Sequence, residues 1–435
     1  MQAPKGTEDL FGEGARAWDA MQQTAREVFG RYGYEMAETP TFEMREVFER
    51  GIGEATDVVS KEMFRALSGD AFEKVAAGTP LKSAQDLALR PEGTAGIVRC
   101  AVQNGLVTPD GPVAKLMYAG PMFRGERPQK GRLRQFHQIG AECLGAAEPT
   151  ADAEMIVMLI EFFEAMGIPR DAMRLLINSM GDDACRPAYR ETVRAYIHEH
   201  SDELCEECNR RADINPLRAF DCKNDRCAEV MEGAPKISDA LCDDCREHYE
   251  AVKRYLDLVG IGYVEDPRLV RGLDYYTRTV FEVQATDALG LGAQNALGGG
   301  GRYDKLVEVM GGRPAPGIGF ALGFERTRIA LEAIGALSGA ARPLDAFVAT
   351  VDPSCDDAGF AIVQALRAAG LAADIDHQGR SLKSQFKQAN NRGARVAVVV
   401  GPDELAAGTC TVRDMQTHDE RTVPIADVAT AIVSE

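Results

Sequence analysis

The stretch FRGERPQKGRLRQFHQIGAE, residues 123–142, carries five Lys and Arg residues in a chain whose formal net charge is −18. It overlaps two segments rich in apolar and aromatic residues, KLMYAGPMFR (115–124) and LRQFHQIGAEC (133–143), and each of them predicts a β-strand. The polar GERPQKGR between them predicts a loop. The sequence therefore predicts a hairpin with partly buried strands, whose arginines lie in or beside its loop.

The second of these strands has a polar face. Gln138 and Glu142 lie on the same side, because side chains alternate along a strand, and Gly140 between them leaves a space. Arginine suits bidentate contacts with phosphate, whereas a carboxylate and an amide suit an amine and an imidazole. Charged runs are commonly just solvated loops, but polar groups that face inward are costly without a ligand. The hairpin therefore predicts a ligand-binding site.

The first 335 residues otherwise alternate between strand-like segments and separate helices. Residues 15–32 have helical spacing, and LALRPEGTAGIVRCAVQ predicts a strand, a turn and a helix. Further elements are a helix at 151–166, strands at 173–179 and 269–283, a glycine turn before a helix at 295–310, and a strand or turn before a helix at 317–334. We expect an α+β domain built on an antiparallel sheet over 1–335, interrupted by a charged, helical insertion at 181–260.

The C-terminal part of the chain has a different pattern. The small-residue segment GALSGAARP (335–343) predicts a linker. After it, strands and helices alternate: DAFVATV, a helix near 356–369, LAADID, a helix near 381–391, and RVAVVVG. This alternation predicts a small α/β domain with parallel strands over 343–435.

Composition limits the classes of protein. A net charge of −18 argues against a general polyanion coat, but a local basic patch can still contact nucleic acid. Residues 377–402 contain five Lys and Arg and no acid, and Arg380, Lys383 and Lys387 are spaced to share one helical face. An odd number of cysteines, the lack of an 18-residue apolar run and an N-terminus without a signal-peptide core predict a reduced, cytoplasmic protein with no membrane span.

Six cysteines cluster in the helical insertion as CEEC (205–208), DCKNDRC and CDDC (242–245). Two C-x-x-C pairs separated by 33 residues are typical of a tetrahedral zinc site, since each pair supplies two thiolates. The sequence therefore predicts structural Zn²⁺ bound by Cys205, Cys208, Cys242 and Cys245, with Cys222 and Cys227 surplus. The alternative is six reduced cysteines that pack in the insertion without a metal.

Three further segments contain candidate site residues. GGGGRYD (298–304) lacks the Lys-Ser/Thr ending of a phosphate loop and is typical of a turn. Arg326 lies near a predicted helix start, where it could contact phosphate or simply be an exposed cation. In RGLDYYTRTVFE, Arg271 precedes Tyr275 and Tyr276 in a segment suited to a buried strand. Tyrosines in strands are commonly packing residues, but a buried arginine is almost always paired.

Taken together, these motifs resemble the class II aminoacyl-tRNA synthetases, and specifically the bacterial histidyl-tRNA synthetase family. ETPTFE with Pro40 looks like the dimer-interface motif 1, FRGERPQKGRLRQFHQIGAE like motif 2 and GIGFALGFERT like motif 3. LVRGLDYYTRTVFE and GGGRYD look like the two signatures specific to histidine. The resemblance implies a class II catalytic domain over 1–335 and an anticodon-binding α/β domain over 343–435.

The resemblance implies a homodimeric ligase that activates L-histidine with ATP and transfers it to tRNA(His). A related alternative is a non-catalytic, synthetase-like regulatory subunit of ATP phosphoribosyltransferase. Such subunits lose signature residues and the C-terminal domain, whereas RGLDYY and residues 343–435 are present here. A third alternative, a zinc-dependent nucleic-acid-binding protein without catalysis, leaves the pocket of Gln138 and Glu142 unexplained.

The resemblance also implies roles for individual residues around ATP. Arg124 would bind the α-phosphate, and Arg271 would be the catalytic arginine beside it, with Mg²⁺ supplying further positive charge. Glu126 would lie at the adenine side, and Arg132 and Arg326 would hold the outer phosphates.

An amino-acid pocket and a tRNA contact are implied in the same way. The histidine-binding residues would be Glu92, Thr94, Gln138, Glu142, Tyr275, Tyr276 and Tyr303. Arg127 and Gln129, in the loop of motif 2, would approach the acceptor end of the tRNA. The insertion varies within the family, so the resemblance implies little about its cysteines.

Overall fold

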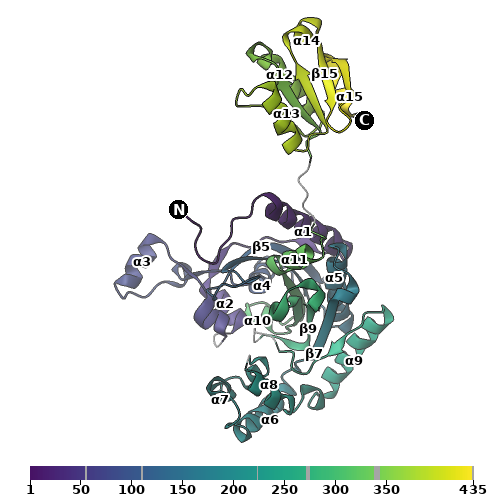
Figure 1. Cartoon of the computed structure of the whole chain (residues 1–435). Helices are drawn as coiled ribbons and strands as arrows, with labels where there is room; N and C mark the ends of the chain where they lie inside the picture. The colour runs from purple at the N-terminus through teal and green to yellow at the C-terminus, as the bar shows by residue number, and fades with distance from the viewer. Residues whose placement is uncertain (54–55, 109–110, 223, 271–274, 338–342, 434–435) are drawn as a thin grey trace. The chain divides into compact units, whose positions relative to one another are not determined.

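The computed structural model describes the chain except for residues 54–55, 109–110, 223, 271–274, 338–342 and 434–435. The described residues form two compact units, Met1–Gly339 and Ala340–Glu435 (Figure 1). Each unit has its own sheet and its own buried core. Within this described part of the chain, none of the helices is both long enough and apolar enough to cross a membrane.

The first unit is built on an eight-stranded sheet in the order β1-β5-β6-β11-β10-β9-β7-β8. The strands from β5 to β7 in this order pair antiparallel, and β1 and β8 add short parallel pairings at the two edges. The expected antiparallel sheet and its hairpin, β5 with β6, are therefore confirmed. The strands are β1 (Glu35–Met36), β5 (Ala114–Phe123), β6 (Gln135–Leu144), β7 (Met173–Ser179), β8 (Val264–Glu265), β9 (Thr277–Ala285), β10 (Ala296–Arg302) and β11 (Gly317–Gly323).

The expectation of a glycine turn at 298–301 is wrong, because these four glycines form the middle of β10. A Cβ atom on Gly300 would overlap the carbonyl oxygen of Gly319 on β11. A Cβ on Gly301 would come within 2.6 Å of the carbonyl oxygen of Thr279 on β9. Glycine is therefore needed here for the close approach of neighbouring backbones, which is the usual meaning of glycine inside a strand.

One face of the sheet carries the main apolar core. On β6 the alternate residues Ile139, Ala141 and Cys143 are buried in this core. α1 (Gly12–Arg31), α5 (Pro149–Ala165) and α9 (Asp243–Leu258) contribute to the same core. Phe29 of α1, for example, packs its ring edge against Phe320 of β11 at 5.4 Å between centroids. Because side chains alternate, Gln138 and Glu142 lie on the opposite face of β6.

The remaining elements of the first unit include a second, smaller sheet and five helices. A separate three-stranded sheet has the order β2-β4-β3, and α4 follows β4 after the turn PEGT, so the expected strand, turn and helix are confirmed. These elements are β2 (Phe42–Met44), α2 (Arg45–Ile52), β3 (Arg65–Ala66), α3 (Gly69–Ala76), β4 (Leu87–Leu89), α4 (Thr94–Gln103), α10 (Leu306–Val309) and α11 (Phe324–Ala333). The segment around Pro40 is divided between β1 and β2.

Between β7 and β9 the chain forms the helical insertion. Its helices α6 (Arg186–Glu199), α7 (Glu206–Ala212) and α8 (Asp225–Glu232) lie together at one end of the unit (Figure 1). They enclose a small core that contains Val193, Ile197 and Met231 together with most of the cysteines of the region. α9 begins in this core and then packs along α5, which returns the chain to the sheet.

The second unit is an α/β domain with a five-stranded sheet in the order β13-β12-β14-β15-β16. The first three strands in this order are parallel, as expected, whereas β15 and β16 add an antiparallel hairpin that the sequence pattern did not indicate. The elements are β12 (Ala346–Thr350), α12 (Asp356–Ala368), β13 (Ala373–Ile375), α13 (Leu382–Asn391), β14 (Val396–Val400), α14 (Pro402–Ala407), β15 (Thr409–Asp414), β16 (Glu420–Pro424) and α15 (Val428–Val433).

Candidate active site

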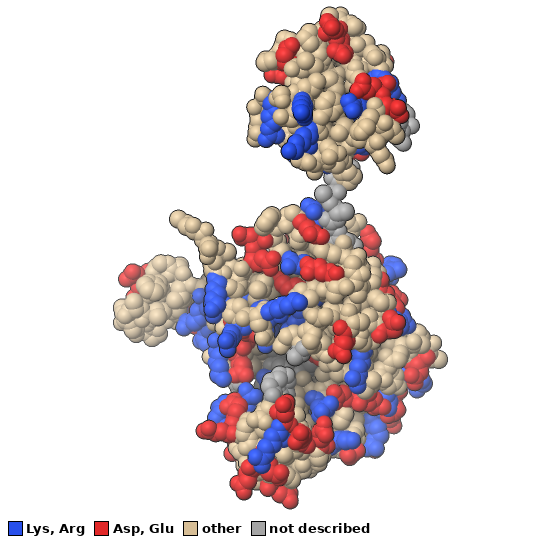
Figure 2. Space-filling model, in the orientation of Figure 1, with Lys and Arg blue, Asp and Glu red and all other residues tan. Residues whose placement is uncertain are grey.

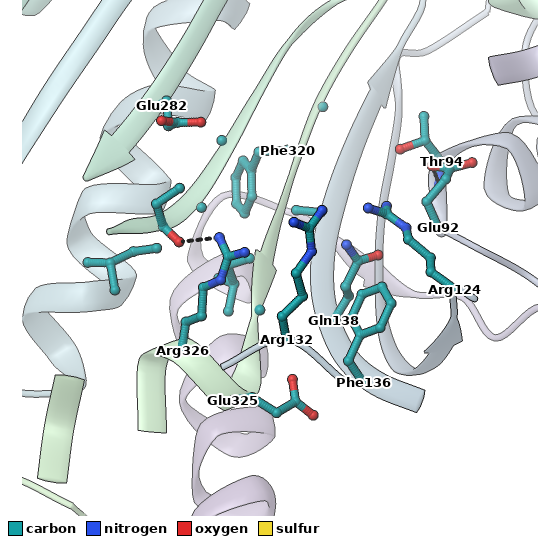
Figure 3. A pocket seen from close by; sticks show the side chains of 18 of the residues that line it. Glu92, Thr94, Arg124, Arg132, Phe136, Gln138, Glu282, Phe320, Glu325 and Arg326 are labelled. Atoms are coloured by element: carbon teal, nitrogen blue, oxygen red, sulfur yellow. Dashed lines mark hydrogen bonds between the residues drawn. The ribbon is translucent and has the colours of Figure 1, made fainter. Parts of the chain in front are cut away.

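A cavity of ≈ 240 Å³ opens on the polar face of β6, between the β5–β6 hairpin and the strands β10 and β11 (Figure 3). Ten residues singled out from the sequence line it: Glu92, Thr94, Arg124, Glu126, Arg132, Gln138, Tyr275, Tyr276, Tyr303 and Arg326. The fold therefore gathers residues from five separate sequence motifs into one concave site, the usual form of a small-molecule site.

Three other candidates do not line this cavity, and a fourth is not among the described residues. Glu142 is fully buried beneath the cavity floor and does not line the cavity itself. Arg127 and Gln129 line a neighbouring depression on the hairpin loop, together with Glu62. Arg271 lies outside the described residues, so its place relative to the cavity stays a prediction.

Arg124 stands at the end of β5 in a fixed orientation. Its Nε donates a hydrogen bond to the Pro91 carbonyl oxygen at 2.9 Å. Its guanidinium lies 5.3 Å from the centroid of the Phe136 ring, which is cation–π distance. The guanidinium is therefore held before any ligand arrives, and Figure 3 shows it directed into the cavity.

Arg326, at the start of α11, is not an exposed helix cation. It donates to the carbonyl oxygens of Gly131 and Ala296 at 3.3 and 3.1 Å, and to Gln294 Oε1 at 3.1 Å. Burial lowers the pKa of its guanidinium, and the nearby positive charge of Arg132 lowers the pKa further. Arg132 pairs with Glu126, but the two guanidinium groups still lie close together in a partly buried place, so this side of the cavity suits a polyanion.

Two carboxylates lie at the other side of the cavity. Both oxygens of Glu92 accept backbone hydrogen bonds at the start of α4, from Thr94 at 2.7 Å and from Ala95 at 2.9 Å. The Thr94 hydroxyl donates to Glu142 Oε1 at 2.7 Å, and the Tyr303 hydroxyl donates to Glu142 Oε2. Thr94 therefore links the two carboxylates into one hydrogen-bonded group.

The pKa values of both carboxyls are displaced in this group. Burial raises the pKa of Glu142 to about 8; the negative charge of Glu92 adds to the rise, and hydrogen bonds from Tyr303 and Thr94 oppose it. Burial also raises the pKa of Glu92. Two buried carboxylates without a cation between them are costly, so this side of the cavity suits a ligand with a positive charge or an N–H donor.

Gln138 has a buried polar atom that a ligand could bind. Its Oε1 is buried and accepts no hydrogen bond from the residues that the structure describes. A buried acceptor without a donor costs about 1–3 kcal/mol, which a ligand N–H would recover. The space expected beside Gly140, in contrast, is filled by the phenol ring of Tyr118, whose Cζ and hydroxyl a Cβ at this position would overlap.

Several lining residues were missed by the sequence analysis, among them Phe136 and Glu282. Phe136 lies on the same face of β6 as Gln138 and Glu142, so the same alternation could have found it. Glu282 lies on β9 opposite Gly299 and also lines the cavity. No local signal marks Glu282, because its position depends on the pairing of β9 with β10.

The metal prediction is wrong in its ligands. The structure does not bring Cys205 and Cys208 together with Cys242 and Cys245. Instead the first pair clusters with the two cysteines that were taken as surplus, Cys222 and Cys227, and the second pair clusters with Asp182 and Cys185. The spacing along the chain indicates which cysteines form a pair, but it does not determine which pairs come together in the fold.

Comparison with known proteins agrees with this geometry. The family model described as histidyl-tRNA synthetase matches residues 6–327. The chain belongs to this family. An anticodon-binding domain model matches residues 345–435, so both units of this histidyl-tRNA synthetase family member have recognised counterparts.

Individual relatives support the same assignment. Curated histidine–tRNA ligases of Anaeromyxobacter dehalogenans and Moorella thermoacetica are 46% and 45% identical to the chain, each over 98% of it, and the matches cover 98% and 96% of those proteins. The crystal structure of apo histidyl-tRNA synthetase from Staphylococcus aureus has a TM-score of 0.80 at 32% identity, with 99% of both chains covered. A Bacillus halodurans structure, titled ATP phosphoribosyltransferase regulatory subunit/histidyl-tRNA synthetase, has a TM-score of 0.60 at 20% identity and so shares the fold.

Proposed function

We propose that the chain is a histidine–tRNA ligase, which activates L-histidine with ATP and then transfers it to tRNA(His). The observation that supports this most is the order of charge across one cavity. Arg326 and Arg132 lie at one side, Gln138 and Arg124 in the middle, and Glu92 at the other side (Figure 3). A triphosphate fits the side of Arg326 and Arg132, and the ammonium group of an amino acid fits the side of Glu92. The reacting groups meet between these two sides.

ATP is placed by the residues of the hairpin and of α11. Arg124 binds the α-phosphate, and Arg132 and Arg326 hold the outer phosphates. The adenine lies against the Phe136 ring, with Glu126 beside it. Mg²⁺, which prefers carboxylate and phosphate oxygens, would be held at the Glu282 carboxylate and would offset part of the phosphate charge.

Histidine is placed by the carboxylate side of the cavity. Its ammonium group donates to Glu92 and to the unpaired Gln138 Oε1. Its imidazole reaches toward Tyr275, Tyr276 and Tyr303. The imidazole N–H donates to the Tyr303 hydroxyl, which in turn donates to the ionised carboxylate of Glu142 behind the cavity lining. This arrangement brings a cation to the two buried carboxylates and a donor to Gln138 Oε1, which accepts no hydrogen bond from the described residues.

The chemistry then follows from these positions. A carboxylate oxygen of histidine attacks the α-phosphorus in line, the bond to the β-phosphate oxygen breaks, and pyrophosphate leaves with the electron pair. Negative charge spreads over the α-phosphate oxygens in the transition state, where the preoriented Arg124 stabilises it, and Arg271 is expected to assist. The 3′-hydroxyl of the terminal tRNA adenosine next attacks the acyl carbon and AMP leaves, with Arg127 and Gln129 near the acceptor end.

The first step can be tested directly by ATP–pyrophosphate exchange. We expect exchange that depends on L-histidine and that other amino acids without an imidazole do not support. Charging of tRNA(His) should follow when the tRNA is added. Histidine binding without exchange would instead support the regulatory-subunit alternative, and neither binding nor exchange would contradict both.

The second unit is proposed to contact the tRNA anticodon region. Lys383, Phe386 and Lys387 of α13 line a shallow depression together with Arg413, whose guanidinium lies 5.2 Å from the Phe386 ring. Figure 2 shows Lys and Arg side chains gathered over α13. Arg380, which was expected on the same helical face, precedes the helix and bonds to Asp376 and Gln378 instead.

Replacing Lys383 and Lys387 together with alanine should raise the KM for tRNA in charging and leave ATP–pyrophosphate exchange unchanged. Each lysine lost from phosphate contact should reduce the slope of log affinity against log salt by roughly one. Tests at several salt concentrations measure this slope, with Arg421→Ala on β16, outside the depression, as the matched control. Equal charging by the double variant and the control would remove this face from tRNA binding.

The homodimer is also part of this proposal. Met36 on β1 and Phe42 and Met44 on β2 are apolar side chains with 39–54% of their surface exposed. Phe42 lies in ETPTFE, which resembles the dimer-interface motif, and the two methionines lie just outside it. Exposed apolar residues grouped in one segment are typical of an interaction surface. Sedimentation equilibrium should give twice the mass of the chain, and a monomer mass would contradict the proposal.

A further inference from the structure

The sulfur atoms of Cys205, Cys208, Cys222 and Cys227 form a compact cluster in the helical insertion. All four lie within 4.8 Å of one another, and those of Cys205 and Cys222 are 3.9 Å apart. Zinc with tetrahedral thiolate ligands at about 2.3 Å places its sulfurs roughly 3.8 Å apart. The cluster therefore already has nearly the dimensions of a four-thiolate zinc site.

Two short chain segments build this cluster. Cys205 precedes α7 and Cys208 lies in its first turn, whereas Cys222 follows the turn Pro216–Asp221 and Cys227 lies in the first turn of α8. The backbone N–H of Cys205 points to the Cys227 sulfur at 3.2 Å, so the two segments also meet through the backbone. Each segment supplies two sulfurs, which is the usual construction of a structural zinc site.

The alternatives explain this cluster less well. A disulfide joins two sulfurs at about 2.05 Å, so disulfide formation does not explain four sulfurs that are all close to one another. The described cysteines are all free thiols. Simple packing of apolar thiols does not require four sulfurs to converge on one point.

We propose that Cys205, Cys208, Cys222 and Cys227 bind a structural zinc ion, which ties α7, the turn before Cys222 and α8 together. The site does not depend on the proposed ligase activity, because none of its residues lines the cavity. It corrects the expected ligand set in one respect: the two C-x-x-C pairs serve different clusters.

A second cluster carries an independent inference, a zinc site with three thiolates and one carboxylate. The sulfurs of Cys185 and Cys245 are 3.9 Å apart. Asp182 Oδ1 lies 3.6 Å from the Cys185 sulfur and 3.8 Å from the Cys242 sulfur. These are the separations that a tetrahedral zinc ion with one oxygen and three sulfur ligands requires, with zinc–ligand distances of about 2.0 and 2.3 Å.

The partner of Asp182 supports a ligand role for its carboxylate. Oδ1 faces the three sulfurs, whereas Oδ2 is 3.3 Å from Arg278 Nη2 on β9. Oδ1 also accepts the Ala184 backbone N–H at 3.0 Å, so neighbouring groups orient both oxygens, as is typical of metal-ligating carboxylates. The backbone N–H of Arg278 also donates to the Gly181 carbonyl oxygen at 2.8 Å. This second zinc would therefore anchor the insertion to β9, next to Tyr275 and Tyr276.

Metal analysis of the full-length protein tests both sites. Protein purified without chelator from zinc-supplemented medium should contain two zinc ions per chain by native mass spectrometry. Cys222→Ser and Cys245→Ser should each lose one zinc ion and keep the other, and Cys100→Ser, outside both clusters, should keep both. X-ray absorption of the zinc should show a sulfur shell at about 2.3 Å.

Each outcome decides one site. Zinc-free protein would overturn both inferences, and a full zinc content in Cys222→Ser or in Cys245→Ser would overturn the first or the second. Because a cysteine variant could fail to fold, cobalt exchange into the unmodified protein provides a second measurement. Tetrahedral thiolate cobalt has intense visible absorption, so two equivalents of cobalt without such bands would also contradict the sites. Histidine-dependent pyrophosphate exchange by the folded variants should stay within a few-fold of the unmodified chain.

Discussion

Arg124→Ala should lower the rate of adenylate formation by ~10²–10³-fold, the scale of losing one preorganised donor to a transition state. The guanidinium is fixed by the Pro91 carbonyl and the Phe136 ring before ATP binds, so little reorganisation is needed when charge develops at the α-phosphate. The effect should therefore fall mainly on kcat of the first step. Pre-steady-state measurement of adenylate formation gives this rate directly.

Arg127→Ala is the matched control, because Arg127 belongs to the same hairpin loop but lines the neighbouring depression. It should leave adenylate formation unchanged and lower the rate of transfer to tRNA. The pair of variants thus separates the two steps on one structural element. Equal loss of the first step in both variants would mean that the hairpin as a whole was disturbed, and an unchanged first step in Arg124→Ala would remove it from the α-phosphate.

Local periodicity was sufficient to predict the half of the site that lies on one hairpin. The alternation of Gln138, Gly140 and Glu142 places the two polar side chains on one face whatever the rest of the fold. The turn PEGT followed by an apolar helix likewise places Glu92 at the start of α4, where its carboxylate accepts backbone N–H groups. These positions depend on neighbours within a few residues, which a sequence displays directly.

The other half depends on pairings between distant segments. Gly319 on β11 lies opposite Glu142 on β6, and a Cβ at that glycine would overlap the Glu142 carboxylate. Gly319, the second glycine of GIGFALG, is therefore needed to leave space for the buried Glu142 carboxylate. The sequence of this segment alone does not reveal that requirement. The cysteines show the same limit, because their spacing along the chain cannot say which pairs meet. Arg271, outside the described residues, rests on the sequence motif alone.

Glu142→Gln should raise the KM for histidine in pyrophosphate exchange by ~10²–10³-fold, the scale of removing one partner of a buried charged pair. Glutamine keeps the shape and can still bond to Thr94 and Tyr303, so the loss reports the negative charge. The KM for ATP should change little. A comparable rise in the KM for ATP would indicate that the whole cavity had been disturbed.

The pH dependence of histidine binding should change in the same variant. Because the pKa of Glu142 is raised to about 8, the pocket without histidine holds a proton at neutral pH. The ammonium and imidazole N–H of the substrate favour the ionised carboxylate, so binding should release a proton and become tighter as pH rises toward 8. Calorimetry at pH 7 in buffers of different ionisation enthalpy measures this release. It should disappear in Glu142→Gln.

The pH dependence of folding stability gives an independent test, because a carboxyl whose pKa is raised by folding destabilises the folded state once it ionises. The Glu142 carboxyl has an ordinary pKa of 4.5 when unfolded and about 8 when folded, so between these values the folded chain holds a proton that the unfolded chain has lost. The stability contributed by this carboxyl therefore decreases as pH rises through that range and is lowest above about 8. Glutamine stays neutral, so Glu142→Gln should unfold at a higher temperature than the unmodified protein at pH 8.5, with the difference shrinking toward pH 5. A variant that binds histidine poorly and is also less stable at pH 8.5 would show that Glu142 serves packing more than substrate charge. The opposite result would show that the pocket keeps an unfavourable buried acid because its ligand needs it.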